Sequence, residues 1–115
     1  LSFFVDSGSP NDIVNGDWQT PTLLNGWVNY GTSHHPAGYR VDALGCVHMR
    51  GYIKDGTTGT VFTLPAPERP TKSLHFAVAT GNEACRCVVN SSGNVILVGY
   101  DNSNVSLSGI SFFTD

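Results

Sequence analysis

The central part of the chain alternates between apolar and polar positions. From Tyr39 to Ile53 every odd-numbered position is apolar or small, and charged or polar residues fall between them. A period of two residues is typical of a β-strand with one buried face. Asp42-Ala43-Leu44-Gly45 interrupts the alternation with a turn signature. We therefore predict a β-hairpin whose second strand continues to the Asp55-Gly56 turn.

The rest of the chain contains further short strand patterns separated by Gly, Asn, Asp and Pro. Thr60–Leu64 predicts the third strand of a β-meander, and the prolines at 65, 67 and 70 predict an extended crossover after it. The longest irregular loop is 31–38, and no segment predicts a helix. Hairpin turns are expected at Asn90–Asn94 and Asp101–Asn104, and a further turn at Gly81–Glu83. The other expected strands are Trp18–Tyr30, bulged or kinked at Gly26, Leu74–Val78, Cys85–Val89, Val95–Tyr100 and Val105–Phe112, bulged at Gly109.

About eight short strands with frequent turns predict an all-β fold, an antiparallel β-sandwich that is jelly-roll-like. The pattern leaves the strand order open. The 115 residues are the length of one domain, in which residues 1–17 form a linker or an N-terminal strand. Because the sequence starts at Leu1 without Met, we expect it to be the C-terminal part of a longer protein.

Composition narrows the possible functions. Only 13% of the residues are charged and thirteen are glycine, which favours turn-rich β structure. The formal net charge is −3 and the six basic residues are scattered, which argues against nucleic acid as a partner. No apolar run is long enough to span a membrane, so we expect no membrane insertion.

Cys46, Cys85 and Cys87 are an odd number of cysteines and a poor basis for a disulfide framework. We expect three reduced and mostly buried thiols. The alternative is a Cys/His metal site that uses His34 or His35, but the spaced pairs of ligands typical of zinc sites are missing. We therefore predict neither a metal site nor a cofactor.

The acidic residues do not indicate catalysis. They lie almost entirely in predicted turns, where Asp is common because its side chain accepts hydrogen bonds from the turn backbone. No G-x-S-x-G motif or catalytic Cys-His context is present. We therefore predict that the chain is not an enzyme. The carboxylates available for a catalytic pair are Asp42, Asp55, Glu68, Glu83 and Asp101.

Several motifs resemble those of one protein family. They are G-W-V-N-Y-G at 26–31, Y-R-V-D-A-L-G-C-V-H-M-R-G at 39–51, V-F-T-L-P-A-P-E-R-P at 61–70, C-R-C-V-V-N-S-S-G-N-V-I-L at 85–97 and V-S-L-S-G-I-S-F at 105–112. Together they resemble the C-terminal receptor-binding head domains of tailed-bacteriophage tail fibres. The resemblance implies a jelly-roll-like homotrimer joined to the rest of the tail fibre. It also implies that the fibre is assembled in the host cytoplasm and acts outside the cell as part of the virion tail. It also implies adsorption to a host-cell-surface receptor.

A saccharide is the receptor that the residues favour, because aromatic rings and planar polar groups suit sugar rings and hydroxyls. We expect the side chains of His48, Arg50 and Tyr52 to share one face of a strand, because they occupy every second position. This face is a candidate ligand site, and the alternatives are a solvated outer face of the sheet or a contact between subunits. Trp27 and Tyr30 are expected in the core. The candidate ligand-binding residues are Trp18, His34, His35, His48, Arg50, Tyr52, Asn82, Glu83, Asp101 and Asn102, of which the last four are equally explained as turn residues.

Two other classes remain open. Asn90-Ser91-Ser92 and Asn104-Val105-Ser106 are formal glycosylation sequons, which would suit a secreted trimeric jelly roll of the complement or tumour-necrosis type. A structural cap at a fibre tip, with no ligand, is the other. Glycan on either Asn in natural material would favour the first class, and a blank screen of cell-wall glycans would favour the second.

Overall fold

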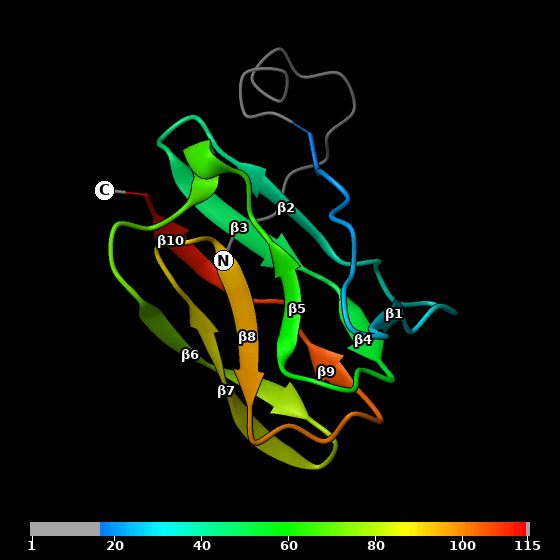
Figure 1. Ribbon diagram of the computed structural model, residues 1–115. Helices are drawn as coiled ribbons and strands as arrows, with labels where there is room; N and C mark the ends of the chain where they lie inside the picture. Colours follow the sequence, from blue (N-terminus) through cyan, green and yellow to red (C-terminus); the bar gives the residue numbers. More distant parts are fainter. Residues whose placement is uncertain (1–16, 115) are drawn as a thin grey trace.

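The computed structural model describes residues 17–114, in which the regular secondary structure is antiparallel β-strand apart from one short 3₁₀ turn (Figure 1). The strand or linker expected before residue 17 lies outside the described residues. The strands form two sheets. The large sheet has seven strands in the order β1 (Val28–Asn29), β4 (Tyr52–Lys54), β9 (Val105–Ser106), β6 (Leu74–Thr80), β7 (Glu83–Val89), β8 (Asn94–Val98) and β5 (Thr60–Thr63). The small sheet has three strands in the order β10 (Ser111–Phe113), β3 (Cys46–Arg50) and β2 (Gly38–Val41).

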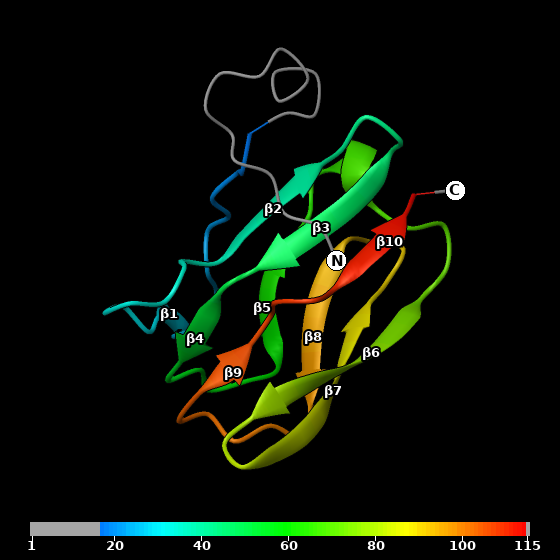
Figure 2. The same ribbon diagram turned by 180° about the vertical axis from the view of Figure 1, so that it is seen from behind.

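The small sheet lies across one face of the large sheet (Figure 2). Buried side chains from both sheets form one hydrophobic core. Val47 and Met49 of β3 are buried from the small sheet, and Phe62 and Leu97 are buried from the large sheet. Val47 and Met49 fall at the positions that alternation marks as inward. The predicted all-β sandwich is therefore confirmed.

Two strands that the sequence predicted as continuous are each divided between the two sheets. Gly51 separates β3 from β4 with a φ of 131°, and a Cβ there would lie 2.5 Å from the Ala37 Cα. Gly109, with a φ of 94°, lies between β9 and β10. Glycine adopts such dihedrals without the clash that a side chain would make. The predicted single strands over 46–54 and 105–112 are therefore wrong.

The two crossings between the sheets are bonded to each other. The Leu107 N–H donates to the Gly51 carbonyl at 2.8 Å, and the Met49 N–H donates to the Ile110 carbonyl at 2.9 Å. We call these two adjacent crossings the seam.

Two of the predicted hairpins are present. In the β2–β3 turn the Gly45 N–H donates to the Asp42 carbonyl at 3.0 Å, and β7 pairs with β8 around the Asn90–Asn94 turn. The predicted hairpin at Asp101–Asn104 is wrong, because β9 pairs with β4 and β6 and not with β8. The meander is also wrong, because β5 pairs with β8 at the far edge of the large sheet. Burial of one face decides which residues point inward, but it does not select the neighbouring strand.

The predicted strand over Trp18–Tyr30 is mostly irregular. Gln19 makes an isolated bridge to Tyr39, and the only strand in this stretch of the described chain is the two-residue β1. Asn25 and Gly26 have φ angles of 55° and 82°, and the Trp27 N–H donates to the Leu24 carbonyl at 3.1 Å. An Asn-Gly pair suits such a turn because both central residues need positive φ.

Trp27 enters the core directly after this turn and is only 2% exposed. Its Nε1–H donates to the Thr58 carbonyl at 2.8 Å, and its ring meets Tyr100 edge-on with 5.3 Å between centroids. The expectation that Trp27 is a core aromatic is confirmed.

The proline-rich crossover is less extended than the sequence predicted. Ala66–Glu68 form a short 3₁₀ turn, where the Glu68 N–H donates to the Pro65 carbonyl at 3.0 Å. Proline at the first positions of such a turn loses no hydrogen bond, because those N–H groups would have no partner within the turn. Among residues 17–114 there is no α-helix, and no helix long and apolar enough to cross a membrane.

All three cysteines are free, as the sequence predicted. Cys85 and Cys87 are buried on the inward face of β7, and Cys46 is half-buried on the outer face of β3. Burial, together with the neighbouring Cys85, raises the pKa of the Cys87 thiol to about 12. Cys87 therefore behaves as a small apolar side chain in the core.

Candidate functional site, an aromatic cluster at the sheet edge

The loop over residues 31–37 is fixed to the edge of the large sheet by backbone hydrogen bonds. The Tyr30 N–H donates to the Tyr52 carbonyl at 2.8 Å, and the Tyr52 N–H donates to the His35 carbonyl at 3.1 Å. The Asn29 side-chain oxygen accepts the Ala37 N–H at 2.8 Å. Both ends of the loop are thus anchored against β1 and β4.

Within this loop the backbone turns sharply ahead of His34. Thr32 has a φ of 56°, which costs a residue with a Cβ about 1–2 kcal/mol. Its hydroxyl lies 3.1 Å from His34 Nδ1, and the His34 N–H donates to the Gly31 carbonyl at 3.2 Å. These contacts hold the His34 ring over β4.

Three rings meet there. His34 stacks on Tyr52 with 4.4 Å between centroids and an interplanar angle of 26°. Tyr30 packs against Tyr52 at 4.8 Å and against His34 edge-on at 5.2 Å. The Lys54 ammonium lies 5.1 Å from the centre of the Tyr30 ring, within the range of a cation–π contact. We call Tyr30, His34, Tyr52 and Lys54 the aromatic cluster.

The aromatic cluster faces solvent at one edge of the protein. His34 is exposed, and the other three members are half-buried, so parts of each ring and the polar atoms reach the surface. Aromatic faces pack against the apolar side of a sugar ring, and phenol, imidazole and ammonium groups hydrogen-bond to hydroxyls. The aromatic cluster therefore offers apolar ring faces and hydrogen-bonding groups side by side at the surface.

His34, His35 and Tyr52 were predicted as ligand-binding candidates from the sequence, whereas Tyr30 and Lys54 were not. His35 is exposed in the same loop and contributes its carbonyl to Tyr52. Tyr30 was expected in the core, yet it is half-buried with its ring in the aromatic cluster, so that expectation is wrong. The available signal for Lys54 was its position two residues after Tyr52, on the same face of one strand.

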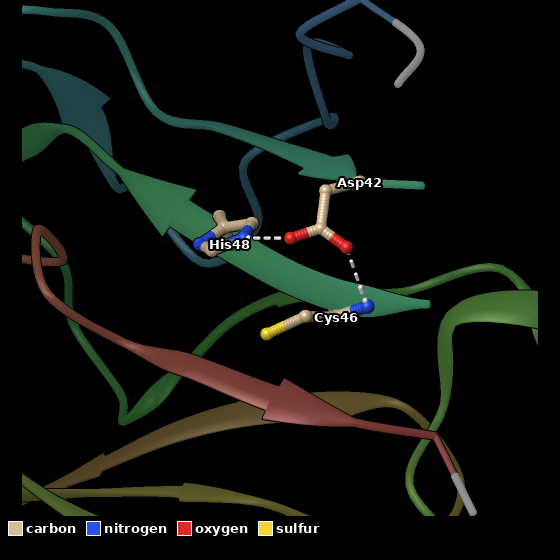
Figure 3. Close-up of side chains that lie close together, drawn as sticks. All are labelled: Asp42, Cys46 and His48. Atoms are coloured by element: carbon tan, nitrogen blue, oxygen red, sulfur yellow. Dashed lines mark hydrogen bonds and ion pairs between the residues drawn. The ribbon is translucent and has the colours of Figure 1, made fainter. Parts of the chain in front are cut away.

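The predicted common face of His48, Arg50 and Tyr52 is divided at Gly51. His48 and Arg50 lie on β3 of the small sheet, whereas Tyr52 lies on β4 of the large sheet. The His48 Nε2 is 2.8 Å from the Asp42 Oδ2. A dashed line marks this contact in Figure 3. The structure therefore does not bring these three candidates together, because the strand changes sheets between the second and the third.

Arg50 instead lies over Trp18. Its guanidinium carbon is 4.1 Å from the centre of the Trp18 ring, and that of Arg40 is 5.7 Å away. Burial, and to a lesser extent the charge of Arg40, lowers the pKa of Arg50. The Arg50 Nε has no hydrogen-bond partner among residues 17–114. Trp18 and Arg50 thus form a stacked pair on the outer face of the small sheet.

The remaining four candidates lie in turns at the ends of strands. Asn82 and Glu83 are exposed at the β6–β7 turn. The Asp101 Oδ1 accepts the Ser103 N–H at 2.9 Å, and the hydrogen bonds from Ser103 lower the pKa of this carboxyl. The Asn102 amide donates to the Gly56 carbonyl at 3.0 Å. Asp101 and Asn102 therefore have turn-stabilising contacts, and a ligand role for any of the four stays a prediction.

A shallow hollow with a volume of about 440 Å³ shares no residue with the aromatic cluster. Its lining is largely apolar, and the Nε–H of its one charged residue, Arg69, donates to the Leu64 carbonyl at 2.8 Å. The sequence analysis gave no signal for it, because its walls come from segments far apart in the chain. The hollow is lined by Pro21, Thr22, Leu24, Tyr39, Thr63, Leu64, Pro65 and Arg69.

Comparisons with known proteins extend the description of the fold. No protein-family model matches the chain, and no curated protein sequence matches it. Among solved structures it is similar to the receptor binding protein (gp15) of Listeria phage PSA. The TM-score is 0.76 at 23% sequence identity, over 90% of this chain and 68% of that one. The two chains share a fold.

Proposed function

We propose that this chain is the receptor-binding head of a phage tail fibre and that it attaches the virion to a saccharide on the host cell surface. The observation that carries the proposal is the aromatic cluster, in which His34 and Tyr52 stack at 4.4 Å at a solvent-facing sheet edge. The fold that the chain shares with a phage receptor binding protein supports the biological setting.

A sugar would be held by the aromatic cluster without covalent chemistry. Its apolar face would lie against the exposed His34 ring and the accessible parts of Tyr30 and Tyr52. The Lys54 ammonium and the tyrosine hydroxyls would hydrogen-bond to hydroxyl groups at its edge. The hydrogen bonds that fix the 31–37 loop keep these rings in place before the ligand arrives, which lowers the entropy cost of binding. The proposed role is therefore adhesion and not catalysis.

Attachment would gain strength from several copies of the head. We propose a homotrimer joined to the rest of the tail fibre, assembled in the host cytoplasm and acting outside the cell. Leu44 is 81% exposed in the β2–β3 turn, and Phe113 is 54% exposed on β10 opposite Cys46, so both lie at the same end of the small sheet. Exposed apolar side chains at one site favour contact with another copy. Three weak sites on one head then act together through effective concentration.

Binding of the isolated head to purified host cell-wall saccharides tests the site. Tyr52→Ala and His34→Ala should each weaken monovalent binding by roughly three- to tenfold, since an aromatic contact contributes about 0.5–1.5 kcal/mol beyond its buried area. His75→Ala is the matched control, because His75 is exposed on β6, outside the aromatic cluster. Full affinity in the Tyr52→Ala/His34→Ala double variant would contradict this site.

The native mass across a dilution series, measured by light scattering, tests the trimer. A mass of three chains that persists on dilution supports closed three-fold assembly. A monomer at every concentration would contradict it and leave a self-contained site in a single chain.

The secreted alternative is tested by mass spectrometry of natural material. Both sequon asparagines already have structural hydrogen bonds: the Asn90 Oδ1 accepts the N–H groups of Ser92 and Asn94 at 3.0 Å each, and the Asn104 Oδ1 accepts that of Gly81 at 2.8 Å. These contacts explain an Asn in each turn through backbone capping. Attached glycan at either position would favour the secreted class over the phage head.

A further inference from the structure

The β2–β3 hairpin brings three different metal-ligating side chains together on the outer face of the small sheet. Asp42, Cys46 and His48 each offer one ligand atom, and these atoms lie within 4.8 Å of one another (Figure 3). All three residues are half-buried, so the group is supported by the sheet and still open to solvent.

The fold positions each member separately. The Asp42 Oδ1 accepts the N–H groups of Leu44 at 2.9 Å and Cys46 at 3.0 Å, which leaves Oδ2 directed at His48. Cys46 and His48 are two residues apart on β3, and side chains with this spacing point to the same face. Strand β10 pairs with the edge of β3 opposite β2, with Ser111 facing His48 in the register.

We propose that Asp42, Cys46 and His48 bind one Zn²⁺ ion, with a fourth position open to water. Zinc accepts thiolate, imidazole and carboxylate ligands at about 2.0–2.3 Å in tetrahedral geometry, and three protein ligands leave one position free. Tetrahedral ligands at that radius are about 3.3–3.8 Å apart. The Asp42 Oδ2 and the His48 Nε2, now 2.8 Å apart, must therefore separate by about half an ångström to admit the ion.

The charges around the group suit a divalent ion bound in this way. The carboxylate of Asp42 and the thiolate of Cys46 together neutralise Zn²⁺, and the Cys46 proton passes to solvent when the Zn–S bond forms. Arg40 of β2 pairs with His48 of β3, and its guanidinium carbon lies 5.7 Å from the centre of the Trp18 ring. A neutral bound centre avoids repulsion with this neighbouring cation.

Zinc titration of the metal-stripped, reduced 115-residue chain tests the proposal, with a chromophoric chelator as competitor. We expect one Zn²⁺ per chain. Loss of a residue that only supports a metal ligand weakens metal affinity roughly 10–100-fold. Cys46→Ser and His48→Ala each remove a ligand itself, so each should weaken zinc affinity by more than that. Asp42→Asn should also weaken it, while its remaining side-chain oxygen can still accept the turn hydrogen bonds.

Two matched variants serve as controls, since His75 is exposed on β6 and Cys85 lies on β7. His75→Ala and Cys85→Ala should retain the affinity of the unmodified chain. Cobalt provides a second readout that needs no variant, because a thiolate ligand gives Co²⁺ an intense charge-transfer band in the near ultraviolet.

Three results would overturn the proposal: no zinc uptake by the unmodified chain at micromolar ion, a cobalt complex without a thiolate band, or His48→Ala binding as tightly as His75→Ala. Because the cobalt spectrum is recorded on the unmodified chain, misfolding of a variant does not affect it. The saccharide measurements above use residues outside this group, so the two proposals can fail independently.

Discussion

Replacement of Gly56 by alanine should destabilise the protein strongly, because the Trp27 indole occupies the space that a side chain would need. A Cβ at Gly56 would lie 1.8, 2.1 and 2.2 Å from three atoms of that ring. The ring is fixed by its hydrogen bond to the Thr58 carbonyl and by its edge contact with Tyr100. The clash must therefore displace either the indole or the loop that follows β4.

The expected loss of unfolding free energy is about 3 kcal/mol. Overpacking a filled core costs about 1–3 kcal/mol, and losing the indole hydrogen bond costs about 1 kcal/mol more. For a domain of about 100 residues each kcal/mol lowers Tm by roughly 4–8 °C, so Tm should fall by about 12–24 °C. Tryptophan fluorescence during urea and thermal unfolding measures both quantities.

Gly99→Ala is the matched control, because nothing lies within 4 Å of a Cβ there but its φ is 76°. Dihedral strain alone should cost it about 1–2 kcal/mol. Gly56 has no such dihedral, so its cost comes from lack of space alone. If Gly56→Ala proves less destabilising than Gly99→Ala, the reasoning from the indole contact is refuted.

Three further predictions address the thiols, a buried hydroxyl and the exposed apolar end. The Cys87 thiol has a pKa of about 12 in the folded protein and about 9 in the unfolded chain, so the free energy of unfolding should fall by about 1.4 kcal/mol per pH unit between these two values. Urea unfolding from pH 8 to 11 measures this fall, and the free energy of unfolding of Cys87→Ala should decrease less steeply with pH. Thr80 is fully buried, and its hydroxyl oxygen accepts a hydrogen bond from the Asp101 N–H at 2.7 Å. Thr80→Val should therefore lower the free energy of unfolding by about 1–3 kcal/mol. The same change at exposed Thr63 should cost less than 1 kcal/mol, and equal costs would contradict the role of burial. Leu44→Asp should weaken self-association in light scattering without lowering Tm of the single chain, and an unchanged mass would exclude this end of the sheet as the contact.

Alternation in the central stretch correctly predicted the inward-facing residues of β3 and β4. Val47, Met49 and Ile53 all lie inward, and the all-β sandwich follows from such patterns. Strand neighbours were less predictable, because a strand with one apolar face can pair on either edge. Phe62 of β5 is buried, yet β5 pairs with β8 and not with β4.

The candidate site was only partly predictable for a related reason. His34 and Tyr52 were named, but for separate reasons of loop position and strand spacing, and their stacking depends on the hydrogen bond between the Tyr52 N–H and the His35 carbonyl. The grouping of Arg50 with Tyr52 failed because spacing by two residues places side chains together only while a strand stays in one sheet. Asp42, Cys46 and His48 lay within seven residues, but their approach required the tight turn and the orientation of the Asp42 carboxylate that it fixes.

The seam determines how a mechanical load would pass through this domain. A pull on a ligand at Tyr52 reaches β3 through a single residue, Gly51, whose carbonyl also accepts the Leu107 N–H from the second crossing. Tension is thereby divided between two chain segments that run side by side and that are tied by backbone hydrogen bonds. For the two sheets to separate, both segments have to extend together, so a head pulled at its sheet edge resists opening as one unit.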